Sequence, residues 1–241
     1  MANLTPDSIA LTDRDGTVFE VPVRLSTRAR RMSLRVDPSR GGAELVIPPG
    51  LDLDHAERFA QSNIGWLRTR LAKLPARVTF EAGAEIPILG VPHMLRHRPD
   101  QRGGVWKVED PDGSLELHVA GEASFLARRV TDHLKAEARK HIAPRARGYA
   151  AQLERKPGRI TMRDTRSRWG SCSSRGDLSF SWRLVLAPEA VLDYVVAHEA
   201  AHLLEMNHSA RFWRVVEHLM PDYERHRRWL KRHGGRLHGY G

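Results

Sequence analysis

Residues 190–204 read AVLDYVVAHEAAHLL, and this stretch decides the fold that we expect for the second half of the chain. Pro188 suits the first position of a helix, and Glu189 suits the positive end of the helix dipole. Apart from Asp193 and the polar residues of the HEAAH segment, the stretch is apolar on nearly all sides, which is typical of an interior helix. Two imidazoles and a carboxylate buried there without partners would cost on the order of 1–3 kcal/mol each. The sequence therefore predicts that something compensates them.

A zinc ion bound by His198 and His202 would supply that compensation. Positions four apart on a helix differ by only about 40°, so both rings project from one face and can bind one ion. Glu199 flanks the same face and can act as general base toward a zinc-activated water, which is the chemistry of the H-E-x-x-H pattern. The alternative is a buried hydrogen-bonded cluster without a metal. The apolar helix and a nearby third histidine favour a zinc site with one ion per chain.

His208 is the predicted third ligand, because it follows His202 by six residues and has the shortest connection to the pair. Metzincins use the same interval with a glycine that breaks the helix, whereas Glu205 stands at that place here, so we expect the helix to continue for another turn. Asn207 then suits the left-handed residue that reverses the chain. The alternatives for the third ligand are Glu205, Glu217, His218, Glu224 and His226, of which a downstream glutamate would be the gluzincin arrangement.

The residues before the metal helix alternate between strand-rich and helical segments. Short β-branched or alternating runs at 18–23, 32–36 and 45–47 predict strands. Apolar residues at helical spacing predict a helix over 53–74, and a second strand-rich stretch follows over 78–119. A long helix is expected over 122–154, with Pro144 as a kink or break.

The remaining segments surround the metal helix, which is itself expected to extend over 188–206. Residues 159–163 read as a strand, 167–176 as a Ser/Gly-rich loop, and 178–184 as a half-buried strand. The last of these is expected beside the metal helix, where an exposed edge would pair with an extended substrate. Further helices are expected over 209–220 and 222–232. The predicted fold class is α+β.

A set of short segments carries a likeness to a known family: 168–173 (RWGSCS), 182–184 (WRL), 194–199 (YVVAHE), 207–209 (NHS), 212–213 (FW), 221–223 (PDY) and 229–231 (WLK). With them the chain resembles the YgjP-like metal-dependent hydrolases, which are zincin metallopeptidases similar to the SprT-like and minigluzincin peptidases. The likeness is dense from 159 to 231 and looser before it, where 31–36 and 63–67 still fit. It implies zinc held by His198, His202 and His208, with Glu199 as catalytic base.

The change from strand-rich to mostly helical patterns gives the expected division of the chain. Residues 1–121 form a β-rich region with one helix, and residues 122–241 form a zincin-like metallopeptidase domain with a small sheet. Two positions depart from the family pattern, since Ala200 stands where leucine is common and Ser181 where asparagine precedes the Trp-Arg pair.

The predicted reaction is hydrolysis of a peptide bond in a peptide or protein substrate. Ser181, Arg183 and Tyr223 are the candidate substrate-binding residues. Arg183, Tyr223 and His226 are the candidates for stabilising the negative charge that develops on the scissile carbonyl. Hydrolysis of a non-peptide amide would use the same residues and is an alternative.

The formal net charge of +10 makes nucleic acid a further candidate partner. The densest basic stretch holds the arginines at 24, 28, 30, 31 and 35, and a solvated strand face is its ordinary explanation. The second functional hypothesis is therefore a nucleic-acid-associated zinc-binding protein or an SprT-like protease linked to DNA. With one cysteine, no secretory signal and no apolar run that would span a membrane, we expect a cytoplasmic protein.

Overall fold

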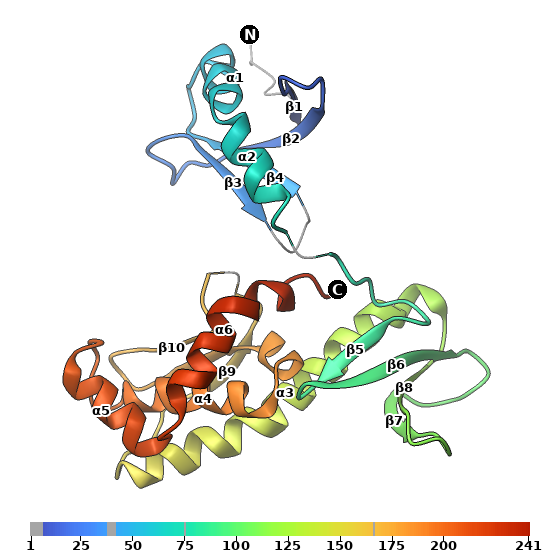
Figure 1. Cartoon of the computed structure of the whole chain (residues 1–241), viewed down its shortest axis with the longest axis vertical. Helices are drawn as coiled ribbons and strands as arrows, with labels where there is room; N and C mark the ends of the chain where they lie inside the picture. Colours follow the sequence, from blue (N-terminus) through green and yellow to red (C-terminus); the bar gives the residue numbers. More distant parts are fainter. Residues whose placement is uncertain (1–6, 38–41, 75, 166) are drawn as a thin grey trace. The chain divides into compact units, whose positions relative to one another are not determined.

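The computed structural model describes residues 7–37, 42–74, 76–165 and 167–241 (Figure 1). They belong to two compact units, Met1–Arg77 and Val78–Gly241, and each unit has a hydrophobic core of its own. Strands dominate the first part of the chain and helices the second, so the predicted α+β class is confirmed.

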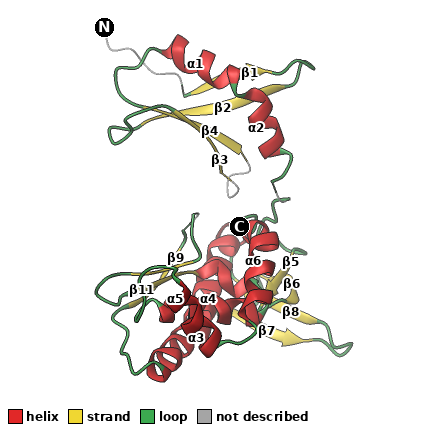
Figure 2. Ribbon diagram, turned by 60° about the vertical axis from the view of Figure 1, so that its left-hand side comes forward, coloured by secondary structure: helices red, strands yellow, loops and turns green. Residues whose placement is uncertain are grey.

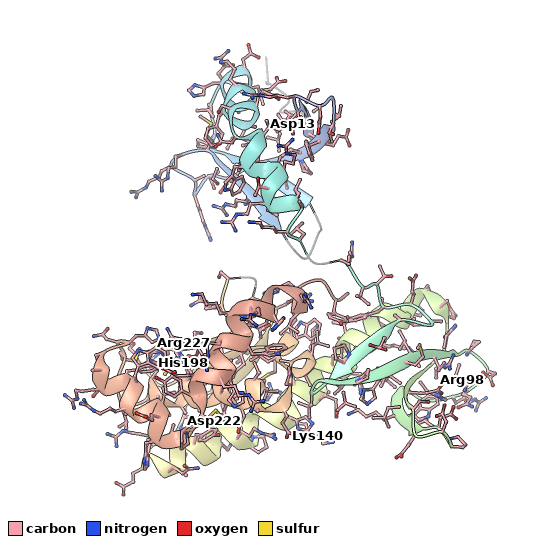
Figure 3. All side chains as sticks on the ribbon, viewed as in Figure 1. Asp13, Arg98, Lys140, His198, Asp222 and Arg227 are labelled. Atoms are coloured by element: carbon pink, nitrogen blue, oxygen red, sulfur yellow. The ribbon has the colours of Figure 1, made fainter. Side chains whose placement is uncertain are left out.

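The first unit is a four-stranded sheet with two helices (Figure 2). The sheet order is β1-β2-β4-β3, and the strands are β1 (Ser8–Thr12), β2 (Val18–Leu25), β3 (Ser33–Asp37) and β4 (Gly42–Ile47). Strands β2 and β4 are parallel, and the other two pairs are antiparallel. An ion pair of 2.8 Å between Arg68 and Asp13, which Figure 3 labels, joins the second helix to the turn after β1.

The helix predicted over 53–74 is two helices, α1 (Leu53–Ser62) and α2 (Ile64–Leu71). Asn63 ends the first and begins the second, with φ −103° and ψ 12°. Its side-chain amide donates to the Phe59 carbonyl at 2.8 Å. Asparagine side chains compete with the backbone for hydrogen bonds in this way, which explains the interruption.

The second unit begins with another four-stranded sheet, in the order β5-β6-β8-β7. Its strands are β5 (Glu85–Ile88), β6 (Val91–Arg98), β7 (Val105–Glu109) and β8 (Leu115–Ala120). The sheet belongs to this unit because its apolar side chains join the core formed by the later helices, and because the Leu89 amide donates to the Val185 carbonyl at 2.6 Å. The compact units thus meet at Arg77 and Val78, whereas the sequence placed a domain boundary between 121 and 122. That boundary stays a prediction, because compactness does not show which segment folds alone.

Helix α3 (Leu126–Gln152) follows a short 3₁₀ helix, η1 (Ala123–Phe125). Seven of its eight buried residues recur every fourth position, at 126, 130, 134, 138, 142, 146 and 150, which gives one apolar stripe along the whole helix. The helix continues through Pro144 instead of breaking there. Packing of the stripe on both sides of Pro144 explains how the helix tolerates one lost backbone hydrogen bond.

A three-stranded sheet lies beside the predicted metal helix. Its order is β10-β11-β9, with β9 (Ile160–Arg163), β10 (Gly170–Cys172) and β11 (Leu178–Ser181). The strand predicted over 178–184 ends at Ser181, the residue paired with the last residue of β9. Beyond it, Trp182–Leu186 form a fully buried 3₁₀ helix, η2. Because β11 is the central strand, the exposed edge beside the metal helix belongs to β10, within the segment that the sequence assigned to a loop.

The last three helices are α4 (Glu189–Ala201), α5 (Ala210–Leu219) and α6 (Tyr223–Leu237). Helix α4 packs against α3, α5, α6, η2 and β10, which explains its apolar residues on all sides (Figure 2). Ser209 caps α5 by accepting a hydrogen bond from the Phe212 amide at 3.4 Å. None of the helices in the described ranges has the length and apolar content needed to cross a membrane.

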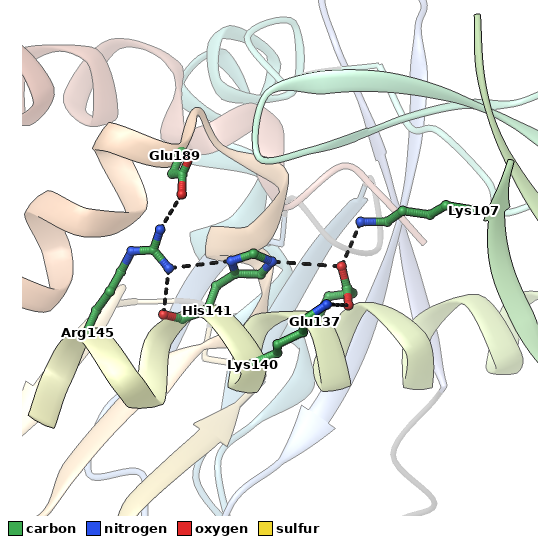
Figure 4. Close-up of polar contacts among 6 residues, drawn as sticks. All are labelled: Lys107, Glu137, Lys140, His141, Arg145 and Glu189. Carbon is green, nitrogen blue, oxygen red and sulfur yellow. Dashed lines mark hydrogen bonds and ion pairs between the residues drawn. The ribbon is translucent and has the colours of Figure 1, made fainter. Parts of the chain in front are cut away.

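Polar contacts fix α3 against the sheet and against the first turns of α4 (Figure 4). Lys107 of β7 donates to Glu137 of α3 at 2.7 Å. Two turns further along α3, Arg145 donates to the Glu189 carboxylate and lies 3.5 Å from an Asp193 oxygen. Helix α4 is therefore held at its beginning by ion pairs and along its length by apolar packing.

The two ends of the second unit meet. The Val78 amide donates to the Gly239 carbonyl and the Gly241 amide to the Val78 carbonyl, each at 2.9 Å. Val78 and Tyr240 thereby form a parallel β-bridge.

Candidate active site

Three imidazoles meet at the end of α4. His198 lies in the last turn of the helix, His202 is its C-cap, and His208 comes from the loop before α5. One ligand atom from each ring lies within 4.8 Å of the other two, and the Nε2 atoms of His198 and His208 are 3.0 Å apart. No other trio of His, Cys, Asp or Glu within the described ranges converges in this way.

The protonation of these rings suits metal binding. Burial, together with the charges of the neighbouring His202 and His208, lowers the pKa of His198 to about 3. Burial also lowers the pKa of His202. The His202 Nδ1 lies 2.9 Å from the Glu205 carbonyl, so Nδ1–H donates and the Nε2 lone pair is available to a ligand. Neutral imidazoles with converging nitrogens fit a metal ion that prefers nitrogen donors.

The loop that brings His208 to the pair begins earlier than the sequence predicted. Helix α4 ends at Ala201, and the Leu204 amide donates back to the Ala201 carbonyl at 3.0 Å in a turn. The regular helix therefore ends before Glu205, although the Glu205 amide still donates to the Ala201 carbonyl at 3.1 Å, and the Glu205 carbonyl accepts the hydrogen bond from His202. The Glu205 carboxylate lies 3.1 Å from Arg211. Glu205 thus supports the site through its backbone.

One phenylalanine contacts all three imidazoles. The ring of Phe212, in the first turn of α5, lies 4.9, 4.5 and 4.7 Å from the rings of His198, His202 and His208. Phe212 is fully buried, so it limits how each imidazole can turn. The spacing of Phe212 and Trp213 predicts core residues, but the sequence does not show that Phe212 packs against the histidines.

Glu199 is 5% exposed and lies against the backbone of β10. Burial raises the pKa of its carboxyl to about 8, although Arg168 acts in the opposite direction. An ideal Cβ built on Gly170 would lie 2.5 Å from both Cγ and Oε1 of Glu199. Gly170 is therefore needed for space, a requirement that the RWGSC segment does not reveal by itself.

These residues share a cleft of about 400 Å³. One wall is the segment Arg168–Cys172, which contains β10, and α4 supplies Tyr194, His198 and Glu199. His202 and His208 also line the cleft, and the apolar side chains of Val195, Met206 and Leu230 complete it. The three imidazoles, the buried carboxylate and the edge strand β10 thus face one space.

Two of the predicted substrate contacts lie outside this cleft. Ser181 is fully buried, and its hydroxyl has no hydrogen-bond partner among the described residues. Arg183 is 6% exposed and donates to Asp164 at 2.8 Å and to the Leu237 carbonyl at 3.2 Å. This placement favours a structural role for Arg183, which joins the end of β9 to the end of α6.

The third predicted contact, Tyr223, lies one layer behind the cleft. Its ring stacks 6.4 Å from Tyr194 and 5.4 Å from Trp213. Tyr194 itself lines the cleft with its ring 5.9 Å from that of His198, and the sequence did not identify it as a site residue. Arg227 was missed as well: it lies 4.3 Å over Trp213 and its charge further lowers the pKa of His198 (Figure 3).

The other candidates for the third ligand do not join the three histidines within the described residues. His226 lies 2.9 Å from an Asp222 oxygen on α6 and does not line the cleft. Glu217, His218 and Glu224 are also outside the cleft lining.

Comparison with known proteins supplies the family. A model of the YgjP-like family, described as a metallopeptidase domain, matches residues 30–233. No curated protein matches the chain. The crystal structure of the metallopeptidase zymogen of Pyrococcus abyssi abylysin matches with 20% identity and a TM-score of 0.30, over 42% of this chain and 92% of that one. Such a TM-score does not indicate a shared fold.

The family match covers most of the chain, including part of the first unit, nearly all of the second and the residues that line the cleft. The matched range contains the three converging histidines and the buried carboxylate of Glu199. The chain therefore belongs to the YgjP-like metallopeptidase family.

Proposed function

We propose that this metallopeptidase binds one zinc ion through His198, His202 and His208 and uses Glu199 as its catalytic base. The observation that carries the proposal is the convergence of three imidazoles within 4.8 Å, beside a buried carboxylate in the same cleft. When bound, zinc would polarise the scissile carbonyl and promote ionisation of water.

Glu199 supplies the proton transfers. A carboxylate whose pKa is raised by burial holds a proton more readily than an exposed one, which suits a group that must both accept and donate near neutral pH. Glu199 takes the proton of the attacking water and later donates it to the leaving amine. Gly170 leaves the carboxylate the space to occupy this position.

The open edge of β10 orients the substrate. Strand β10 pairs with β11 on one side, and its residues line the cleft. An extended peptide can add to such an edge through backbone hydrogen bonds that do not depend on side-chain identity. This arrangement favours peptide substrates over small amides. The strand that pairs with the substrate is then Gly170–Cys172, in place of the expected residues 178–184.

The number of protein ligands that the site offers also separates the two functional hypotheses. A structural zinc normally has four protein ligands, whereas a catalytic zinc keeps one position open for water or substrate. The described residues supply a group of three histidines with a carboxylate beside it. This favours catalysis over a purely structural ion in a nucleic-acid-associated protein.

The proposal is tested by metal analysis together with digestion of a mixed peptide library. Glu199→Gln should retain near-stoichiometric zinc and lose cleavage by about 10²–10⁴-fold, because it removes the acid–base group and leaves the ligands. His198→Ala should lose both zinc and cleavage. Equal cleavage by wild type and Glu199→Gln would remove the catalytic assignment.

The third ligand has its own control. His208→Ala should weaken zinc binding, while Glu217→Ala and Glu224→Ala, which replace the alternative glutamate ligands, should bind zinc like wild type. If His208→Ala retained zinc and one of the glutamate variants lost it, that glutamate would be the third ligand and His208 would not.

A further inference from the structure

A second hollow in the unit Val78–Gly241 shares no lining residue with the active-site cleft. It has a volume of about 710 Å³ and lies between α6 and the first turn of α4. Most of its polar lining comes from one helix, α6, which contributes Arg225, His226, Arg228, Trp229, Arg232 and His233. We call this hollow the α6 groove.

The α6 groove carries an excess of positive charge. Arg225, Arg228 and Arg232 are exposed, and no carboxylate oxygen of the described residues lies within 4.0 Å of their guanidinium groups. The acidic residue in the lining is Asp222, whose carboxylate already accepts a hydrogen bond from His226 at 2.9 Å. Like charges three and four positions apart destabilise a helix, so these arginines are placed where an anion would stabilise them.

The spacing of the arginines fits a row of phosphates. Positions 225, 228 and 232 fall on one face of α6, and at 1.5 Å per residue their Cα atoms span about 10 Å along the axis. A guanidinium binds phosphate oxygens through two parallel N–H donors. Three such groups in a row suit a linear chain of phosphates better than a single small anion.

Aromatic rings lie between these cations. Trp229 and His233 follow Arg228 and Arg232 in the sequence, line the same hollow, and have ring centroids 5.1 Å apart. Both side chains are partly exposed. A basic groove with interleaved aromatic rings is the arrangement by which proteins bind single strands, because bases stack on the rings while the backbone follows the charges.

We propose that the α6 groove binds single-stranded nucleic acid, with its three arginines on phosphates and with Trp229 and His233 against bases. The proposal requires neither the metal nor peptidase activity. It also differs from the sequence-based expectation, which placed a nucleic-acid contact on the arginines of the first unit.

The test is fluorescence anisotropy of a labelled oligothymidine of about 12 nucleotides, which is within the range of single-strand site sizes. The variant is Arg225→Gln/Arg228→Gln/Arg232→Gln. The matched control is Arg28→Gln/Arg30→Gln/Arg31→Gln, which removes the same charge from exposed positions of the first unit. All six residues are exposed, so both variants should have the same Tm as wild type.

The expected loss follows from counterion release. Each phosphate contact on a single strand contributes about −0.7 to the slope of log K against log salt, so losing three contacts should make the slope shallower by about 2. At about 0.1 M salt this corresponds to roughly 10²-fold weaker binding by the α6 variant. The control should bind within about two-fold of wild type.

Two further probes identify the ligand class. Inorganic polyphosphate offers the phosphates without bases, and polyglutamate offers carboxylates, so both should bind more weakly than oligothymidine. Equal or tighter binding of either probe would overturn the assignment to nucleic acid. An equal loss in the two triple variants, or no binding by wild type at low salt, would overturn the α6 groove as the site.

Discussion

Replacing Gly170 by alanine should displace the Glu199 carboxylate and leave the three imidazoles in place. The new Cβ would lie 2.5 Å from Cγ and Oε1 of Glu199 and 2.7 Å from Cδ, whereas ordinary contact begins at 3.4 Å. The carboxylate must therefore retreat by roughly 1 Å to restore normal van der Waals distances. The three atoms nearest to this Cβ all belong to Glu199, so the strain falls on the proposed catalytic base.

A displacement of about 1 Å at a catalytic group costs about 10²-fold in rate. We expect kcat/KM of Gly170→Ala to fall by about that factor, which corresponds to about 2.7 kcal/mol of transition-state stabilisation. Overpacking typically costs about 1–3 kcal/mol, so a small decrease in Tm should accompany the loss. The metal content should equal that of wild type, because the imidazoles keep their places.

The assay combines peptidase kinetics, metal analysis and thermal unfolding. Gly148→Ala is the matched control, since a Cβ there meets nothing within 4 Å and the residue lies inside α3. It should keep wild-type activity and gain about 0.5–1 kcal/mol of stability. Wild-type kcat/KM in Gly170→Ala, or loss of activity together with the metal, would refute the reasoning.

Two predictions concern the contacts that support the site. Burial opposes ionisation of Asp164, but the hydrogen bond and charge of Arg183 outweigh it and lower the pKa of the carboxyl. Asp164→Asn should therefore cost about 1 kcal/mol at pH 7, a modest value because Asp164 is half exposed. A carboxyl whose pKa is lowered by folding stabilises the folded state at pH values above its unfolded pKa of about 3.9. The difference in the free energy of urea unfolding between wild type and Asp164→Asn should therefore shrink as the pH falls below about 4. A difference that does not change with pH would contradict the ion pair. Tyr149→Phe removes a 2.9 Å hydrogen bond to Asp193 and should cost about 1 kcal/mol in the same assay, whereas unchanged stability would show that this bond contributes nothing.

The metal helix was predictable because its determinants are local. The apolar content of α4, the pair His198 and His202 four residues apart, and the short connection to His208 all lie within one segment, and the structure brings these rings together. The roles of the rings as ligands stay a proposal.

The supporting residues were not predictable because their partners are far away in the sequence. Strand β10 has three residues and exists because it pairs with β11, so its Ser/Gly-rich sequence reads as a loop. The need for Gly170 arises from Glu199, on another element. Likewise, the sequence of α4 does not show that the Glu205 carbonyl will accept a hydrogen bond from His202.

Arg183 is a residue that the sequence assigned to the site and that the structure places outside it. A conspicuous arginine beside the predicted site was interpreted as a substrate contact, yet its guanidinium binds Asp164 and the last carbonyls of the unit. Only the folded chain places those acceptors around it.

The β-bridge between Val78 and Tyr240 makes the second unit topologically close to a ring. A short linker from Gly241 to Val78 would therefore complete a circular permutant, with new termini opened in the exposed turn at 100–104 between β6 and β7. Every helix and strand of the second unit would keep its covalent continuity in such a molecule.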